Sequence, residues 1–181
     1  HGETEGSLAG QHTSRTDGPV TANGCALARS LAAQLAGKIF ALVVTSPRQR
    51  AHMTAQLAGF PNAVVTEDLR EFDYGEYEGL LKAEILARAP GWNIFRDGCP
   101  GGETVAQVAE RAGRVVARAR AAGDTLVFTH GHMGRMVATS WLGQPPTFGA
   151  QLALGTCTLS ILTSEADKPP GIQAWNCGEE V

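Results

Sequence analysis

Four side chains of this sequence have the types that phosphoryl transfer requires: His1, Arg50, Glu71 and His130. A neutral imidazole can attack phosphorus and form a phosphohistidine intermediate. An arginine presents a planar fork of N–H donors that matches phosphate oxygens, and a second histidine, if protonated, adds another donor. A carboxyl group can protonate the leaving oxygen and then accept a proton from water. This inventory predicts phosphoryl transfer through a histidine, in which no step needs a metal or another cofactor.

Two apolar runs of strand length, residues 39–45 and 125–129, would bring Arg50 and His130 together. Continuous apolar runs are typical of strands buried in a parallel sheet. Arg50 follows the first run and His130 follows the second. Because the carboxyl ends of parallel strands meet at one edge of a sheet, and sites form there, we expect these side chains to lie close together.

Segments with helical composition alternate with the strands. We expect helices at residues 21–36, 47–58, 80–89, 104–122 and 134–142, and further strands at 63–66, 157–163 and 172–176. The polar stretch 67–79, which contains Glu71, reads as a loop. The alternation predicts an α/β domain of three α/β/α layers with a mostly parallel central sheet, spanning residues 1–181 as a single domain.

The composition excludes several classes of function. The chain has 181 residues, of which 43% are hydrophobic and 18% charged, which suits one soluble globular domain. A net charge of −3 leaves no basic surplus for a phosphate backbone, and no apolar run reaches membrane length, so we expect neither nucleic acid nor membrane as a partner. The four cysteines lack the spacing of zinc ligands, which favours reduced thiols, no metal site and a cytoplasmic protein.

Four blocks of sequence resemble, in order, the motifs of the histidine phosphatase superfamily, also called the phosphoglycerate mutase-like family. They are HGETEGSLAGQHTSRTDGPVT at 1–21, TSPRQRAHMTA at 45–55, DLREFDYGEYEGL at 68–80 and FTHGHMGR at 128–135. The stretch WNIFRDGCPGGET at 92–104 further resembles the branch that contains sedoheptulose-bisphosphatase-like and acid-phosphatase-like members. Each block alone is a weak signal, whereas the four in order are specific.

The resemblance implies a role for each matching residue. It makes His1 the phosphorylated nucleophile, Arg50 a phosphate-binding arginine, Glu71 the proton donor and His130 the second phosphate-binding histidine. It also places four further residues around the phosphate of the substrate: Ser7, Thr13, Ser14 and Gly131. His132 is expected to support the site and not to act in it, and His12 is expected to be a surface or packing residue.

The sequence departs from the family pattern at its start. The family motif has an arginine before the first histidine and an apolar central strand before that arginine, whereas this sequence begins at His1. Losing a central strand would remove ladder hydrogen bonds and buried area, so we expect the natural chain to continue upstream. An intact mass of the natural protein that matched 181 residues would contradict this expectation. Gly6 and Ser14 also differ from the usual family residues, which bears on substrate preference more than on chemistry.

These observations predict a metal-independent phosphomonoesterase that hydrolyses a small phosphorylated metabolite, such as a sugar phosphate, without a cofactor. One alternative is a phosphoglycerate mutase, which uses the same phosphohistidine but returns the phosphoryl group to a bound product. The other is an inactive module that only binds phosphate. The short connection between Glu71 and the 104–122 helix leaves little room for a lid that excludes water, which favours hydrolysis. The oligomeric state stays open, with a homodimer as one option.

Overall fold

Three parallel strands form the sheet at the centre of the computed structural model, which describes residues 1–165 and 167–178. The strand order is β2-β1-β3, with β1 (Leu42–Thr45) between β2 (Val64–Val65) and β3 (Thr125–Phe128). Thr45 of β1 lies opposite Val65 of β2 and Phe128 of β3, so the three strands end together at one edge. The predicted α/β class and parallel central sheet are therefore confirmed.

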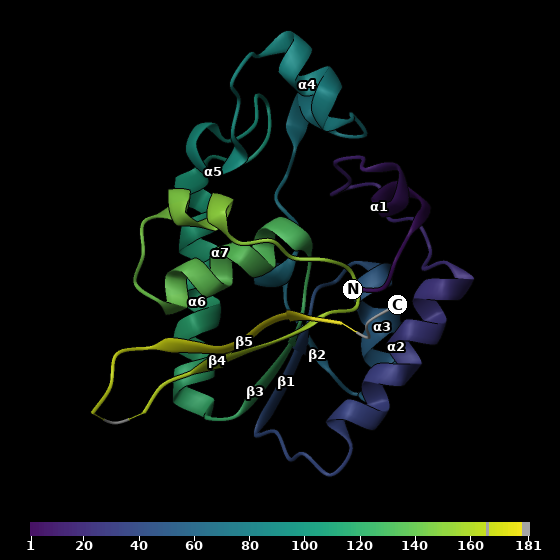
Figure 1. Cartoon of the computed structure of the whole chain (residues 1–181), viewed down its shortest axis with the longest axis vertical. Helices are drawn as coiled ribbons and strands as arrows, with labels where there is room; N and C mark the ends of the chain where they lie inside the picture. Colours follow the sequence, from purple (N-terminus) through teal and green to yellow (C-terminus); the bar gives the residue numbers. More distant parts are fainter. Residues whose placement is uncertain (166, 179–181) are drawn as a thin grey trace.

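Helices cover both faces of this sheet (Figure 1). On one face, side chains of α2 (Ala22–Leu35) and α3 (Gln49–Leu57) pack with Leu126 and Phe128 of β3. On the other face, α6 (Val105–Ala122) and α7 (Gly131–Trp141) pack with Val44 of β1. Because successive side chains of a strand point to opposite faces, these short strands contribute to both clusters, and the result is the predicted α/β/α layering.

Local signals explain where the long helices begin. Thr21 accepts a hydrogen bond from the N–H of Gly24 and begins α2, as its sequence predicts. Thr104 and Gln107 form the capping box that begins α6. The predicted strand 39–45 is shorter than expected, since Ile39 is 88% exposed and pairing begins only at Leu42.

Some short elements carry no clear signal in the sequence. The remaining helices are α1 (Glu5–Ala9), α4 (Lys82–Arg88) and α5 (Ile94–Asp97), and the 3-10 helices are η1 (Glu67–Leu69), η2 (Gly75–Tyr77) and η3 (Pro146–Gln151). Of these, only α4 corresponds to a predicted helix, and α7 begins three residues before the predicted 134–142 helix. Residues 67–79, here called the acid loop, consist of turns and 3-10 helix, in agreement with the predicted loop.

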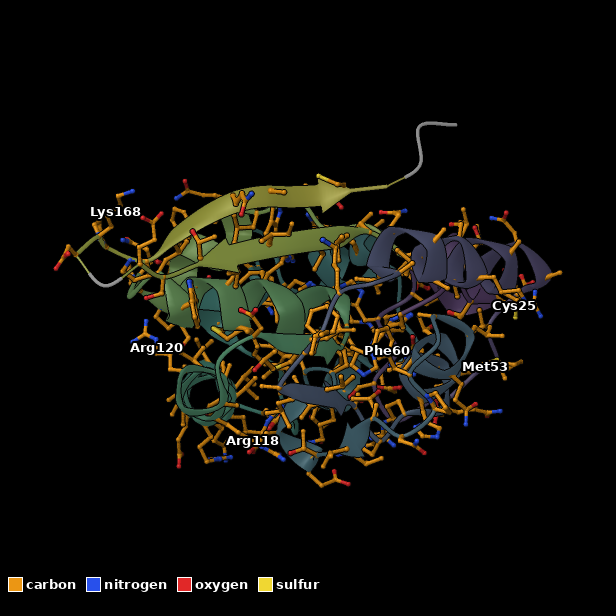
Figure 2. The ribbon with its side chains drawn as sticks, turned by 90° about the horizontal axis from the view of Figure 1, so that it is seen from below. Cys25, Met53, Phe60, Arg118, Arg120 and Lys168 are labelled. Atoms are coloured by element: carbon orange, nitrogen blue, oxygen red, sulfur yellow. The ribbon has the colours of Figure 1, made fainter. Side chains whose placement is uncertain are left out.

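The late strands β4 (Leu159–Thr163) and β5 (Gly171–Cys177) form an antiparallel hairpin of their own. The hairpin forms the upper side of the molecule in Figure 2, with Lys168 at the end of its turn. Among the described residues, β3 and β4 are not hydrogen-bonded to each other, and a cavity of about 1440 Å³ is lined by both strands. The strand expected upstream of His1 stays a prediction.

Candidate active site at the carboxyl edge of the sheet

His1 is held by its backbone between β3 and the segment that leads to β4. Its amino nitrogen donates to the carbonyl of Thr129 at 2.9 Å, and its carbonyl accepts from the N–H of Cys157 at 3.0 Å. The N–H of Gly2 donates to Oγ1 of Thr54 on α3 at 2.7 Å. The ring nitrogen Nδ1 lies 2.8 Å from the Gly2 carbonyl, which can only accept, so Nδ1 carries the proton. Nε2 of His1 is therefore left with a free lone pair.

His130 lies beside His1, and the centroids of their rings are 4.9 Å apart. It is the N-cap residue of α7 and only 2% exposed. Its Nε2 lies 2.7 Å from Oγ of Ser46, which follows β1, whereas in the described part of the chain its buried Nδ1 has no hydrogen-bond partner. Burial and the neighbouring charge of Arg50 lower the pKa of His130 well below its usual value. The ring is therefore neutral, and Nδ1 carries its proton when Nε2 accepts from the Ser46 hydroxyl.

Arg50 is on α3 and is 2% exposed, with its guanidinium beneath the loop that follows α1. Its Nη2 donates to the carbonyl of Thr13 at 2.9 Å and its Nη1 to that of Thr16 at 3.0 Å. Nη1 also lies 3.4 Å from Oδ1 of Asp17. A guanidinium has five N–H donors, so these contacts leave some free, and among the described residues the buried Nε has no hydrogen-bond partner. Arg50 is not among the described residues that line the cavity, but its buried positive charge acts on His130.

Glu71 reaches from the acid loop to the start of α7. Its two carboxylate oxygens accept from the backbone N–H groups of Phe72 at 2.8 Å, His132 at 3.0 Å and Met133 at 2.9 Å. Burial alone would raise the pKa of Glu71, but the His132 ring and these three donors outweigh it, and the pKa is lowered. The carboxyl group is therefore an ionised acceptor, stabilised at the positive end of a helix.

The remaining predicted residues fall into two groups. Thr13 and Ser7 line the cavity together with Gly131, which is the first residue of α7. The hydroxyl of Ser7, however, already donates to the carbonyl of Thr4 within the cap of α1. Ser14 is not in the cavity lining, and its N–H donates to the carboxylate of Glu78 at 2.9 Å.

Sequence reasoning missed the residues that hold these groups in place. Ser46 contacts His130, and a serine at the end of a buried strand is a signal that could have identified it. Glu78 also accepts from the N–H of Thr16 at 2.9 Å and so holds the loop next to Arg50. Nothing local marks Glu78, because its partners lie more than 60 residues away.

Comparisons with known proteins agree with this geometry. Residues 1–178 match the histidine phosphatase superfamily (branch 1). The chain belongs to the histidine phosphatase superfamily. This histidine phosphatase is 41% identical over 167 residues to an acid phosphatase of Mycobacterium tuberculosis, covering 89% of this chain and 82% of that protein. It is 37% identical over 177 residues to sedoheptulose 1,7-bisphosphatase of Saccharomyces cerevisiae, covering 79% of this chain and 65% of the yeast protein.

The fold is also similar to the solved structure of a functionally characterised open reading frame from Mycobacterium tuberculosis. The TM-score is 0.92 at 38% identity, covering 98% of this chain and 94% of that one. The family predicted from the four sequence blocks is confirmed, and two relatives carry the names of the predicted branch. In the described part of this histidine phosphatase, no group of three His, Cys, Asp or Glu side chains could hold a metal, and no helix is long and apolar enough to cross a membrane.

Tyr74, His12 and His132 form an aromatic cluster in this histidine phosphatase that approaches Glu71 through His132. Nδ1 of His132 lies 2.6 Å from the hydroxyl of Tyr74 and 3.9 Å from Oε2 of Glu71. His12 stacks on His132, with centroids 5.7 Å apart. Nδ1 of His12 lies 3.1 Å from the carbonyl of Leu80 and donates to it, which agrees with the packing role expected of this residue. His132 therefore contacts groups around Glu71, as its expected supporting role requires.

His132 is expected to make the stability of this histidine phosphatase depend on pH. Burial lowers its pKa from 6.5 to about 4 in the folded chain. Between these values the unfolded chain binds more protons, so stability is complete above pH 6.5 and is lost as the pH falls toward 4. Linkage converts this difference to about 3 kcal/mol of unfolding free energy.

Urea unfolding of the wild type and of His132→Asn at pH 7, 5.5 and 4.5 measures this contribution. Asparagine keeps an acceptor for Tyr74 but cannot titrate, so the variant should lose less stability over this range. His52→Asn serves as the control, because the hydrogen bond of His52 is to the exposed Gln56 on the same helix. Equal pH dependence of the wild type and His132→Asn would rule out the assignment.

Proposed function

We propose that this chain is a metal-independent phosphomonoesterase that acts through a phosphohistidine on His1. The observation that carries the proposal is the close approach of two imidazole rings, His1 and His130, whose centroids lie 4.9 Å apart beside the buried charge of Arg50. An imidazole lone pair next to a second imidazole and a guanidinium suits attack on a phosphoryl group whose oxygens need positive charge. A phosphoryl group placed there would lie next to His1.

In the first step, Nε2 of His1 attacks phosphorus while the bond from phosphorus to the leaving oxygen breaks. Arg50 and His130 stabilise the negative charge on the equatorial oxygens. The departing oxygen takes a proton from the carboxyl group of Glu71 and leaves as an alcohol. The products of this step are an alcohol, phosphohistidine and ionised Glu71.

In the second step, water attacks the phosphohistidine. Glu71 accepts a proton from the water, and the phosphorus–nitrogen bond breaks with its electron pair returning to Nε2 of His1. Inorganic phosphate leaves, and the site regains its starting protonation. The three backbone donors that lower the pKa of Glu71 favour the ionised form that this step needs.

The first step needs the opposite protonation state of Glu71. A bound phosphoryl dianion brings negative charge close to the carboxylate, and like charge raises a carboxyl pKa. Substrate binding therefore favours uptake of the proton that the leaving group requires. The same argument predicts higher activity on alkyl phosphates at acidic than at alkaline pH.

We propose a small phosphorylated metabolite, such as a sugar phosphate, as the substrate, in a cytoplasmic setting and without a cofactor. The names of two relatives, an acid phosphatase and a sedoheptulose bisphosphatase, support this substrate class. Polar side chains in the cavity lining, among them Thr13, Gln11 and Tyr74, suit an alcohol rich in hydroxyl groups.

The test is phosphate release from a panel of sugar phosphates, 3-phosphoglycerate and p-nitrophenyl phosphate in the presence of EDTA. We expect release that survives EDTA and falls at least about 100-fold in His130→Ala, because one charge-stabilising donor is lost. Release that requires an added divalent cation would overturn the metal-free scheme.

Two other outcomes separate the alternatives. Conversion of 3-phosphoglycerate to its 2-isomer, with little free phosphate, would establish a mutase. Vanadate binding without either reaction would establish a phosphate-binding module. Size-exclusion chromatography of the same sample distinguishes a monomer from the homodimer considered above.

A further inference from the structure

We propose that the ion pair between Glu103 and Arg111 positions Glu71 for proton transfer, a proposal that rests on the function proposed above. Glu103 lies just before α6, and Arg111 lies on that helix. Neither is among the described residues that line the cavity. Their side chains contact the acid loop and Met133 of α7, so they would act through Glu71 as positioning residues.

The pair is buried and geometrically specific. Nε of Arg111 lies 2.9 Å from one carboxylate oxygen of Glu103, and Nη2 lies 2.8 Å from the other. The two side chains are 6% and 10% exposed, and Arg70 adds a third contact at 3.3 Å. A buried ion pair is by itself weak evidence for stability, because apolar residues of similar size often serve equally well. The contacts that the pair makes with the acid loop are therefore more informative than the ion pair itself.

The two side chains form hydrogen bonds with the main chain of the acid loop on both sides of Glu71, the proposed proton donor. On the N-terminal side, Nη1 of Arg111 donates to the carbonyls of Asp68 at 2.8 Å and Arg70 at 3.1 Å. On the C-terminal side, the carboxylate of Glu103 accepts from the N–H of Asp73 at 3.0 Å, and the N–H of Glu103 donates to the Asp73 carbonyl at 3.0 Å. Four main-chain contacts thus fix the loop within a few residues of Glu71.

Two further contacts tie this arrangement to the helix that binds the Glu71 carboxylate. Nη1 of Arg111 lies 3.5 Å from Sδ of Met133, whose N–H donates to Glu71. A Cβ on Gly102 would overlap the carbonyl of Asp73, so this position requires glycine and brings the two backbones into direct contact. The acid loop, α6 and α7 therefore meet at one buried ion pair, and a shift in that pair moves the carboxyl group relative to the phosphate donors.

The test compares two classes of substrate in Glu103→Gln. Glutamine keeps the shape of the side chain but has no negative charge, so its interaction with Arg111 is weaker. Departure of an alkoxide needs a proton from Glu71, whereas departure of p-nitrophenolate does not. The ratio kcat/KM reports events up to departure of the leaving group, so it isolates this step. We expect kcat/KM for the best alkyl phosphate to fall about 10- to 100-fold, since small misplacements have effects of this size, and kcat/KM for p-nitrophenyl phosphate to change less than about 3-fold.

Three further variants make the result specific. Glu71→Gln alone should show the same selective loss, and adding Glu103→Gln to it should lower kcat/KM by less than about 2-fold more, because coupled residues are not additive. Arg111→Lys keeps the charge but loses the fork, so it tests the proposal if Glu103→Gln does not fold. Glu110→Gln is the matched control, because Glu110 lies exposed on the same helix and its ion pair is with the exposed Arg114.

The outcomes separate this proposal from the proposed function. Equal losses on both substrates in Glu103→Gln and Arg111→Lys, or full additivity with Glu71→Gln, would overturn the positioning role while leaving the function intact. If Glu71→Gln did not lower kcat/KM for the alkyl phosphate more than for p-nitrophenyl phosphate, the proton-donor role of Glu71 would be wrong. The positioning role would then fail with it. Vanadate inhibition should be unchanged in Glu103→Gln, since Arg50 and His130 are untouched.

Discussion

Replacing His1 with alanine is expected to abolish phosphate release, with kcat falling by about 10⁴-fold or more, because loss of a nucleophile has effects of this size. The imidazole of His1 is the only side chain of the proposed scheme that forms a bond to phosphorus. Its Nδ1 proton is directed to the Gly2 carbonyl, which leaves Nε2 free for attack. Phosphate release and acid-labile labelling of the protein by radioactive substrate measure the two parts of this prediction.

The binding of the anion should survive this change. Arg50 and His130 are unchanged in His1→Ala, so vanadate should still bind within about 10-fold of its wild-type affinity. A His1→Ala protein that retained turnover or stable labelling would show that another residue is the nucleophile. Loss of vanadate binding together with turnover would point instead to collapse of the site.

Replacing Arg50 with methionine is expected to lower kcat/KM by about 10³-fold, because a buried cationic donor in the site is removed. Methionine fills the space of the side chain but has neither charge nor N–H groups. The effect should appear with alkyl and aryl phosphates alike, since both carry the same phosphoryl group. Steady-state kinetics on one substrate of each type measures it.

Arg50→Met should also release the loop above the site. The carbonyls of Thr13 and Thr16 lose their donors, and proteolysis of the 13–17 segment should become faster. Arg29→Met is the matched control, because Arg29 is exposed on α2. An Arg50→Met protein with kcat/KM within 10-fold of the wild type would contradict a role for Arg50 in holding the phosphoryl group.

The relation between His130 and its surroundings shows why protonation could not be predicted from the sequence. A histidine after a buried strand is compatible with either charge state. In the folded chain, burial and the nearby Arg50 keep His130 neutral, and Ser46 contacts one of its nitrogens. Ser46 and Arg50 both follow β1, whereas His130 follows β3, so only the parallel pairing of the two strands brings them together.

The sequence by itself determined the elements with strong local signals, and it predicts the site residues. Apolar runs predicted β1 and β3, the expected helices 21–36 and 104–122 correspond to α2 and α6, and the parallel pairing of β1 and β3 puts Arg50 and His130 after the same edge of the sheet, as expected. These signals are local, because burial on both faces of a strand and capping of a helix depend on residues that are close in the chain.

The tertiary structure alone decided how the site is charged and what holds it. These contacts join segments that are tens of residues apart. They are the N–H groups that donate to Glu71, the loop carbonyls that accept from Arg50, and the hydrogen bonds of Glu103 and Arg111 to the acid loop. Hydrogen-bond partners and pKa shifts at buried groups depend on which elements pack together, and the sequence pattern of a single segment carries no record of them.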